Sequence, residues 1–405
     1  MRASSTSSSE GLRGQGRLPT RRLAAALAYV GSGARLFALS LAFLLVLGEV
    51  YMRLPFIPQR LEYRPDRELG GVLRPDQVGY VWLGNMSLQS PPITINRDGH
   101  RGRDTDWSRP VMLVVGDSES FGAGVEDPEV WTARLESALR RRPELAALQV
   151  VNASHPGHGP HHQVVFLRRA LEAHRVDGVL VRVAVGQRNF RVPPPAELER
   201  EIATARWRER LRSVTKFVPF LYNKFEAQVP RIRAALMPAP LRRRPAPGGG
   251  DTSPAAGRAA WREGRAAWEE MARLTGCVDI PITFVVHDAT GRPAAAALAE
   301  SLGGLVDAGG RVHVIRLGPE AFGLGERQGA EARQLLRETL TLGRDPHANP
   351  RQHQLIADAL TTGLEAAGVT ARLGHRGAPR GAASAVAGAD PTARPDCLRP
   401  AAAAR

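Results

Sequence analysis

The chain is organised around one stretch, Val111-Met112-Leu113-Val114-Val115-Gly116-Asp117-Ser118-Glu119-Ser120-Phe121-Gly122. An apolar run of this length is typical of a strand that is buried on both faces, as in a parallel sheet. Gly116 allows the chain to turn sharply where the strand ends. In open α/β sheets, ligands and chemistry lie just beyond the carboxyl ends of the strands. Ser118 therefore stands where a reactive hydroxyl would be useful.

Apolar strand patterns alternate with helical patterns along most of the chain. Five strands are expected at Val111–Val115, Leu148–Asn152, Gly178–Val185, Ile282–Val286 and Val312–Leu317. Helical spacing is found between or after them, at Glu129–Arg141, His162–His174, Ala294–Gly303, Ala330–Leu342 and Arg351–Ala367. This alternation predicts an α/β fold with a parallel, doubly wound sheet of five strands.

One long interruption separates the third strand from the fourth. Residues 191–280 are rich in arginine and mostly helical in pattern, and residues 238–250 within them are rich in proline and glycine. The Pro/Gly-rich part is typical of a flexible linker. We interpret 191–280 as a helical insertion beside the site.

The N-terminal part predicts a membrane anchor. Residues 1–22 are basic and lack an apolar period, so we expect a disordered tail. The apolar segment 23–54 exceeds the roughly 20 residues that span a bilayer. No small-residue cleavage site follows it, which favours an uncleaved signal anchor over a cleaved signal peptide or a buried core helix. Basic residues before the span place the N-terminus in the cytoplasm and the remainder on the periplasmic or extracellular side.

The rest of the chain divides by composition. Residues 55–110 are a Pro- and Arg-rich lead-in with short strand-like pieces, and they precede a globular domain over 111–370. From 371 to 405 the chain is rich in Ala, Gly, Pro and Arg, and we expect a second disordered tail.

The composition argues against several classes of protein. The chain has 405 residues and a formal charge of +15, and its only lysines are Lys216 and Lys224. The arginines are spread along the chain among acids, without an aromatic–basic motif, which argues against nucleic-acid binding. Cys277 and Cys397 are too few for a disulfide framework or a zinc site. We expect no cofactor and no nucleic-acid partner.

A second cluster of polar residues follows the second strand. Four histidines crowd into this loop and the start of the next helix: His155, His158, His161 and His162. No carboxylate or cysteine joins them at zinc spacing, so we expect the polar rim of a substrate cleft and no metal site. His287-Asp288 is expected to be a loop near the cleft. Glu119 is expected to be a solvated acid or an acid at a helix N-terminus.

A serine nucleophile needs a base and an acid that orients the base. The strongest candidates lie far downstream in Gly343-Arg344-Asp345-Pro346-His347-Ala348-Asn349-Pro350. Asp345 and His347 are separated by one rigid proline, so the carboxylate can accept a hydrogen bond from the imidazole Nδ1 within one loop. The alternative interpretation is a helix N-cap followed by a surface histidine.

Donors for an oxyanion should come from the ends of neighbouring strands. Gly157, in the loop after the second strand, can present its backbone N–H in a tight turn. Asn189, after the third strand, can present a side-chain amide. The backbone N–H of Ser118 is the third candidate.

Together these residues resemble the SGNH hydrolases, the GDSL esterase/lipase superfamily. Four blocks occur in the family's order: Gly116-Asp117-Ser118, Asn152-Ala153-Ser154-His155-Pro156-Gly157, Gly186-Gln187-Arg188-Asn189 and Asp345-Pro346-His347-Ala348-Asn349. The lead-in Asn96-Arg97-Asp98-Gly99-His100-Arg101-Gly102 and the Glu49 that closes the apolar helix look like the membrane-anchored bacterial branch. The resemblance covers roughly residues 93–190 and 280–367.

The resemblance implies a flavodoxin-like three-layer α/β/α domain and a set of roles. Ser118 would be the nucleophile, His347 the base, Asp345 the acid that orients it, and Gly157 an oxyanion donor. The third block departs from the pattern, which expects Asn followed by Asp, where this chain has Arg188 followed by Asn189. Either Asn189 fills the oxyanion role one residue late, or Arg188 stands there with a changed function.

The function implied is ester hydrolysis through an acyl-serine. Carbohydrate O-acetyl esters at the cell surface are the substrate class that family and location suggest. An O-acyltransferase with the same triad stays open, as does a non-catalytic glycan-binding or envelope scaffold protein with a degenerate oxyanion block. A soluble intracellular lipase is a further and weaker alternative.

Overall fold

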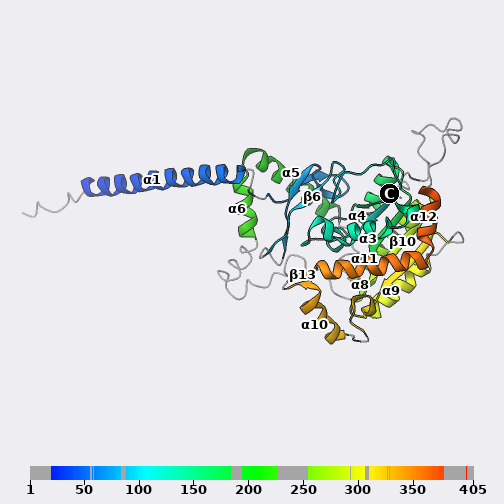
Figure 1. Cartoon of the computed structure of the whole chain (residues 1–405). Helices are drawn as coiled ribbons and strands as arrows, with labels where there is room; N and C mark the ends of the chain where they lie inside the picture. The colour runs from blue at the N-terminus through cyan, green and yellow to red at the C-terminus, as the bar shows by residue number, and fades with distance from the viewer. Residues whose placement is uncertain are drawn as a thin grey trace, which may run out of the picture.

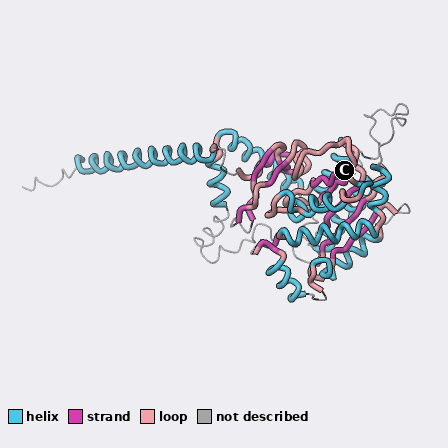
Figure 2. Tube along the Cα trace, viewed as in Figure 1, coloured by secondary structure: helices cyan, strands magenta, loops and turns pink. Residues whose placement is uncertain are grey.

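The computed structural model describes residues 20–54, 57, 59–83, 88–183, 194–226, 254–291, 293–305, 310–325, 327, 329–343, 345–377 and 398. Figure 1 shows a globular α/β body from which one long helix, α1, extends away. Figure 2 shows the strands of the central sheet enclosed by helices.

The central sheet confirms the predicted fold class. Its strands are β7 (Val111–Val115), β8 (Gln149–Asn152), β9 (Gly178–Val183), β10 (Ile282–His287) and β11 (Val312–Leu317). They lie in the order β11-β10-β9-β7-β8, and each neighbouring pair is parallel. This is the flavodoxin-like order, in which the first strand lies between the second and the third. The order reverses beside β7, so a crevice is expected at its carboxyl end.

Strand β7 is buried along its whole length because both faces of the sheet are covered. Val111, Leu113 and Val115 point into one apolar core, while Met112 and Val114 point into the other. Alternate residues of a strand face opposite sides, so a continuous apolar run is what two covered faces require.

Three helices cover one face: α4 (Pro160–Ala173), α8 (Pro254–Cys277) and α9 (Pro293–Gly303). The other face is covered by α3 (Trp131–Leu139), α11 (Pro350–Ala366) and α12 (Val369–Gly377), together with the 3₁₀ turns Pro143–Leu145 and Pro319–Phe322 and helix α10 (Gly329–Thr339). The domain is therefore a three-layer α/β/α sandwich.

The last helix of the segment 191–280 belongs to the sandwich. Trp268 and Met271 of α8 are fully buried in the core that contains β9 and β10. Because α8 lies between these two parallel strands in the sequence, it serves as their crossover helix. Of two earlier helices, α5 (Pro195–Val214) lies over β1 and β2 of the lead-in, and α6 (Phe217–Glu226) packs against α1 and α5. The expected linker 238–250 falls outside the described residues.

The lead-in forms short antiparallel pairs next to the turn Gly116-Asp117-Ser118. Its strands are β1 (Tyr63–Asp66), β2 (Gly70–Leu73), β3 (Gln77–Gly79), β4 (Trp82–Leu83), β5 (Leu88–Gln89) and β6 (Ile93–Ile95). A third apolar core joins them to the chain after Ser118, with Ile93 and Ile95 packed in the same cluster as Phe121. The lead-in thereby supports the site.

Helix α1 (Thr20–Arg53) has the length and composition of a membrane span. Its segment Gly33–Arg53 is long and apolar enough to cross a bilayer, a test that a signal sequence also passes. None of that segment's apolar window is buried within the rest of the structure, so α1 is not a core helix. The C-terminal end of α1 is held by Glu49. The Glu49 carboxylate accepts hydrogen bonds from the Thr215 hydroxyl and from the backbone N–H of Phe217, the first residue of α6.

The expected boundaries of the two tails need correction. The second tail was expected to begin at 371, but α12 continues to Gly377 and buries Leu373 against the sheet's helical layer. At the other end, residues 20–22 of the expected first tail already belong to α1, while residues 1–19 lie outside the described residues. Burial of a few apolar side chains outweighs a composition that suggests disorder.

Candidate active site

Three side chains from the two ends of the domain meet beyond the carboxyl end of β7. Ser118 is the first residue of the short helix α2 (Ser118–Phe121), and Asp345 and His347 lie on β13 (Asp345–Ala348). Ser118 Oγ lies 2.9 Å from His347 Nε2. His347 Nδ1 lies 2.5 Å from Asp345 Oδ1, which also accepts the His347 backbone N–H at 2.9 Å.

These contacts define the proton positions. A carboxylate only accepts hydrogen bonds, so the bond to Asp345 places the imidazole proton on Nδ1 of His347. Nε2 is then unprotonated and can accept the Ser118 hydroxyl proton. Asp345 is buried, with 4% of its side chain exposed, whereas His347 keeps 22%. The arrangement can activate a serine and is open to a substrate on the histidine side.

The Asp345–His347 strand is held from both ends. β13 pairs antiparallel with β12 (Thr341–Leu342). Asn349 then caps α11, because its side-chain oxygen accepts the Gln352 backbone N–H at 3.0 Å. The Asn349 amide nitrogen also donates to the Thr339 carbonyl at 3.0 Å. The cap of this helix is therefore Asn349, and Asp345 is left to orient the histidine.

Close packing makes glycine necessary at 116. A Cβ on Gly116 would lie 2.5 Å from Ser120 Oγ, and the Ser154 hydroxyl approaches from the next loop. Asp117 follows in an extended conformation and caps α2, since its carboxylate accepts the Glu119 backbone N–H. The turn therefore exposes Ser118 at the start of a helix.

Arg182 of β9 fixes Asp117 from the neighbouring strand. Its guanidinium donates to both carboxylate oxygens of Asp117 at 2.5 Å, and both side chains are largely buried. A second nitrogen of Arg182 donates to His287 Nδ1 at 3.2 Å. Arginine has no acceptor, so His287 Nδ1 accepts this bond, and His287 Nε2 lies 3.3 Å from the side-chain amide nitrogen of Gln352. Asp288 pairs with Arg316 at 2.8 Å.

Arg101 holds the chain that follows Ser118. It donates to three backbone carbonyls, those of Phe121 at 2.7 Å, Gly122 at 2.5 Å and Val125 at 2.6 Å. It also pairs with Asp127 at 3.0 Å, and only 2% of its side chain is exposed. Burial lowers the pKa of Arg101 to about 10, which leaves it charged at neutral pH. Arg101 and Arg182 are supports that sequence reasoning did not identify.

The loop after β8 lies against the same turn. The His155 backbone N–H donates to the Gly116 carbonyl at 3.1 Å. The Asn152 side chain donates to the Ser120 carbonyl at 2.8 Å and accepts the Ser154 N–H at 3.2 Å. These bonds connect the loop after β8 to the turn that presents Ser118.

Gly157 extends this loop in a conformation that favours glycine. Its φ of 83° lies in the left-handed region, and a Cβ there would meet nothing. In the described part of the chain, neither the Gly157 nor the Ser118 backbone N–H donates to a protein acceptor. Both are thus available as oxyanion donors. Arg188 and Asn189 lie in 184–193, outside the described residues.

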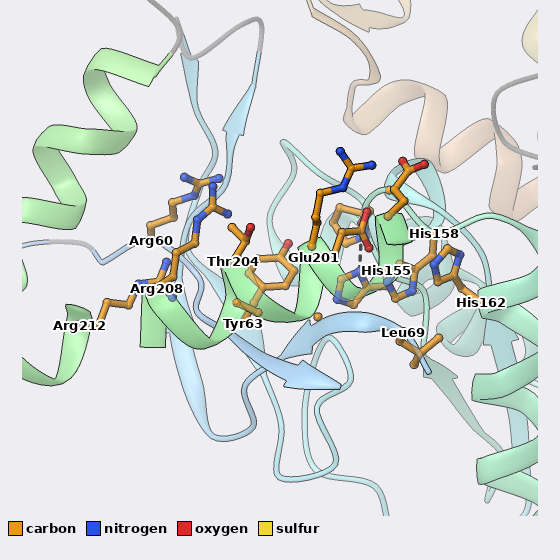
Figure 3. Close-up of a pocket in the computed structure, with 16 residues that line it drawn as sticks. Arg60, Tyr63, Leu69, His155, His158, His162, Glu201, Thr204, Arg208 and Arg212 are labelled. Atoms are coloured by element: carbon orange, nitrogen blue, oxygen red, sulfur yellow. Dashed lines mark hydrogen bonds between the residues drawn. The ribbon is translucent and has the colours of Figure 1, made fainter. Parts of the chain in front are cut away.

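Three of the four histidines after β8, namely His155, His158 and His162, line a cleft of about 790 Å³. The rings of His155 and His158 stack at 3.8 Å, and those of His158 and His162 at 4.5 Å. Burial lowers the pKa of His155 to about 4 and that of His162 to about 3. They are therefore neutral at pH 7, and Figure 3 shows them at one end of the cleft. No group of three or more metal-holding side chains occurs among the described residues.

Glu119 differs from the expectation of a solvated acid. It does lie in the first turn of α2, but it is only half exposed, and burial raises the pKa of its carboxyl above the usual value. Arg182 and His347 oppose that rise by their charge. Glu119 is thus part of the charge environment of the site.

No family model matches the chain, and no curated protein matches it. Three of the similar solved structures are the following. One is a protein assigned to the G-D-S-L lipolytic family from Desulfitobacterium hafniense, with 10% identity, a TM-score of 0.36, and coverage of 62% of this chain and 98% of that chain. TesA has 15% identity, a TM-score of 0.35, and coverage of 64% and 99%. An acetylxylan esterase from Geobacillus stearothermophilus has 14% identity, a TM-score of 0.33, and coverage of 63% and 94%. Because these identities and TM-scores are low, the similarity does not support any statement about the activity of this chain.

Proposed function

We propose that this chain is a serine ester hydrolase of the SGNH type. The observation that carries the proposal is the aligned contact series from Ser118 Oγ through His347 to Asp345, formed by residues 229 positions apart. The availability of the Ser118 and Gly157 N–H groups supports it, because an oxyanion needs donors that are already in place. Asn189 is proposed as the third donor.

The proposed reaction has two halves. His347 Nε2 takes the hydroxyl proton as Ser118 Oγ attacks the ester carbonyl, and the tetrahedral oxyanion is stabilised by backbone N–H groups. His347 then gives the proton to the leaving alkoxide, which departs as an alcohol and leaves an acyl-serine. Water attacks the acyl-serine with His347 again as base, and the acid and free serine result. Asp345 keeps the imidazole in its tautomer and stabilises the imidazolium.

The acyl-bearing substrate is proposed to be an O-acetylated carbohydrate. An acyltransferase would use the same acyl-serine with a sugar hydroxyl in place of water. The two are separated by the product: free acetate in water against an acetylated acceptor when a sugar alcohol is supplied.

Replacing Asp345 with asparagine is expected to slow aryl acetate hydrolysis by the purified full chain by roughly 10²- to 10⁴-fold. The amide would hold His347 with the wrong tautomer, while the volume of the side chain is kept. The steady-state kcat of Asp345→Asn checks this expectation. Asp358→Asn, on the exposed surface of α11, is the matched control. An Asp345→Asn rate equal to that of wild type would favour the non-catalytic scaffold instead.

Location is proposed as the cytoplasmic membrane, with residues 55–405 on the outer side. The exposed apolar helix α1 supports an anchor, and Cys277 is disulfide-bonded, a state that persists mainly in oxidising compartments. The proposed organisation is an anchor over 20–54, a lead-in over 55–110, and a hydrolase domain over 111–377, in which α5 lies beside the cleft and α8 belongs to the sandwich.

Protease added to spheroplasts is expected to degrade the globular domain, because that domain would face the medium. Immunoblotting against the domain before and after membrane lysis measures it, with a cytoplasmic protein as the protected control. Protection of the domain until lysis would contradict the proposed orientation.

A further inference from the structure

The cleft beside Gly157 has a second, strongly basic end. Its lining includes Arg60, Arg200, Arg208 and Arg212, against the acids Glu197 and Glu201. Figure 3 shows Arg60, Arg208 and Arg212 gathered at the end away from His155, His158 and His162. We call the first group the arginine end and the second the histidine end. The two ends differ in charge, because the histidines are held neutral by burial.

Helix α5 forms one wall of the cleft with a polar face. Its lining residues recur at helical spacing: Glu197, Arg200, Glu201, Thr204, Ala205, Arg208 and Arg212. Residues three or four apart share one side of a helix. Of the α5 residues, only Ala205 is fully buried, on the side toward β1 and β2. A helix that presents charged side chains to a cleft suits a polar ligand.

Like charges are held close together at the arginine end. Burial lowers the pKa of Arg212; the negative charge of Glu62 opposes that shift, and the positive charges of Arg60 and Arg208 add to it. The same three arginines oppose the rise that burial causes in the pKa of Tyr63. The arginine end is thus a site of positive potential within a partly enclosed cleft, where charge interactions are screened less than on an open surface.

We propose that the arginine end binds an anionic group, a carboxylate or a phosphate, that belongs to the same molecule as the ester cleaved at Ser118. Guanidinium groups match both anions because they donate two parallel hydrogen bonds. The histidine end, next to Gly157, receives the neutral part that carries the acyl group. This inference rests on the proposed ester hydrolysis and adds the substrate class: an acylated acid, rather than a neutral acylated sugar.

Two sources supply such an anion. One is the carboxylate of a sugar acid in a soluble glycan, and the other is the phosphate of a lipid-borne sugar. A smaller hollow supports the phosphate of a lipid-borne sugar as a source. It shares Arg60 and Arg212 with the cleft, and it is also lined by Met52, near the end of α1. A lipid headgroup at the membrane surface would reach the arginine end from that side.

The test compares esters that differ in charge, with the full chain in detergent. For wild type, the kcat/KM for acetylated glucurono-oligosaccharides is expected to be at least ~10-fold above that for neutral acetylated xylo-oligosaccharides. Arg208→Gln is expected to lower the kcat/KM for the charged ester by roughly 10- to 100-fold. Arg206→Gln, on the exposed side of the same helix, is the matched control and leaves both values unchanged. Added salt lowers the preference for the charged ester.

Hydrolysis of an aryl acetate tests the proposed ester hydrolysis separately from the arginine-end proposal, and it also shows whether each variant is folded. Absence of this activity in wild type would end the proposed function. If aryl acetate is cleaved, the arginine-end proposal is tested by two comparisons against the neutral sugar ester: one with the charged sugar ester in solution, and one with an acetylated sugar phosphate in vesicles. Equal rates in both comparisons overturn the arginine-end proposal. Preference for the soluble charged ester supports a carboxylate, and preference for the vesicle-borne ester supports a phosphate. Arg208→Lys, which keeps the charge, is expected to recover part of the loss, whereas a folding defect would lower aryl acetate turnover in both variants.

Discussion

Ser118→Ala is expected to lower kcat for an aryl acetate by about 10⁴- to 10⁶-fold, and His347→Ala by a similar factor. Ser118 Oγ is the atom placed to attack, and His347 Nε2, at 2.9 Å, is the base in contact with it among the described residues. Because the two act as one unit, the double variant is expected to be no slower than the worse single variant. Initial rates of phenol release under saturating substrate measure all three.

Control measurements show whether the loss of kcat is specific to the site. His375→Ala, on the exposed surface of α12, removes a histidine far from Ser118 in the fold and is expected to keep the wild-type rate. Thermal melting of each variant shows whether the fold is intact. Additive losses from Ser118→Ala and His347→Ala would show that they do not act together and would contradict the proposed mechanism.

Acidification is expected to unfold the domain between about pH 6.5 and pH 4. Several buried histidines are neutral in the fold, with burial as the main cause; among them, His155 has its pKa lowered to about 4, and His162 and His353 to about 3. In the unfolded chain they regain values near 6.5. The unfolded state therefore binds more protons below pH 6.5, and stability falls as the pH falls.

The expected size of this effect is large. At pH 5 each of the three histidines favours unfolding by about 2 kcal/mol, a sum of about 6 kcal/mol against a typical net stability of about 5–15 kcal/mol. Urea unfolding from pH 7.5 to 5 measures the slope. His353→Gln is the informative variant, because an amide oxygen can replace Nδ1 as acceptor for the Trp131 N–H without titrating. A stability that stays flat from pH 7 to 5 would show that these histidines are not buried neutral.

The sheet could be predicted because its strands carry the strongest local signal. Continuous apolar runs such as Val111–Val115 are rare outside buried parallel strands, and they set both the strand positions and the number of strands. The role of α8 was missed because the segment before β10 is rich in Arg and Ala, and few large apolar residues, among them Trp268, Met271 and Leu274, mark its buried face. The α12 helix was missed for the same reason, since Leu373 is one of few apolar residues there.

The site could be predicted only in part. Asp345 and His347 lie two residues apart, so their contact follows from local geometry, whereas the contact with Ser118 followed from the family's block order. Arg101 and Arg182 were not foreseen, because their partners are backbone carbonyls and a carboxylate brought close by folding. Arg182 did leave a signal: a lone arginine inside the apolar strand β9 needs a buried partner.

Covalent labelling by a fluorophosphonate tests the central claim most directly, because the reaction requires the nucleophile, the base and access together. Wild-type protein is expected to gain one label, found by mass spectrometry on the peptide that contains Ser118. Ser118→Ala is expected to take up none, and His347→Ala to react far more slowly. Absence of label on wild-type Ser118, or equal labelling of wild type and His347→Ala, would contradict a serine activated by His347.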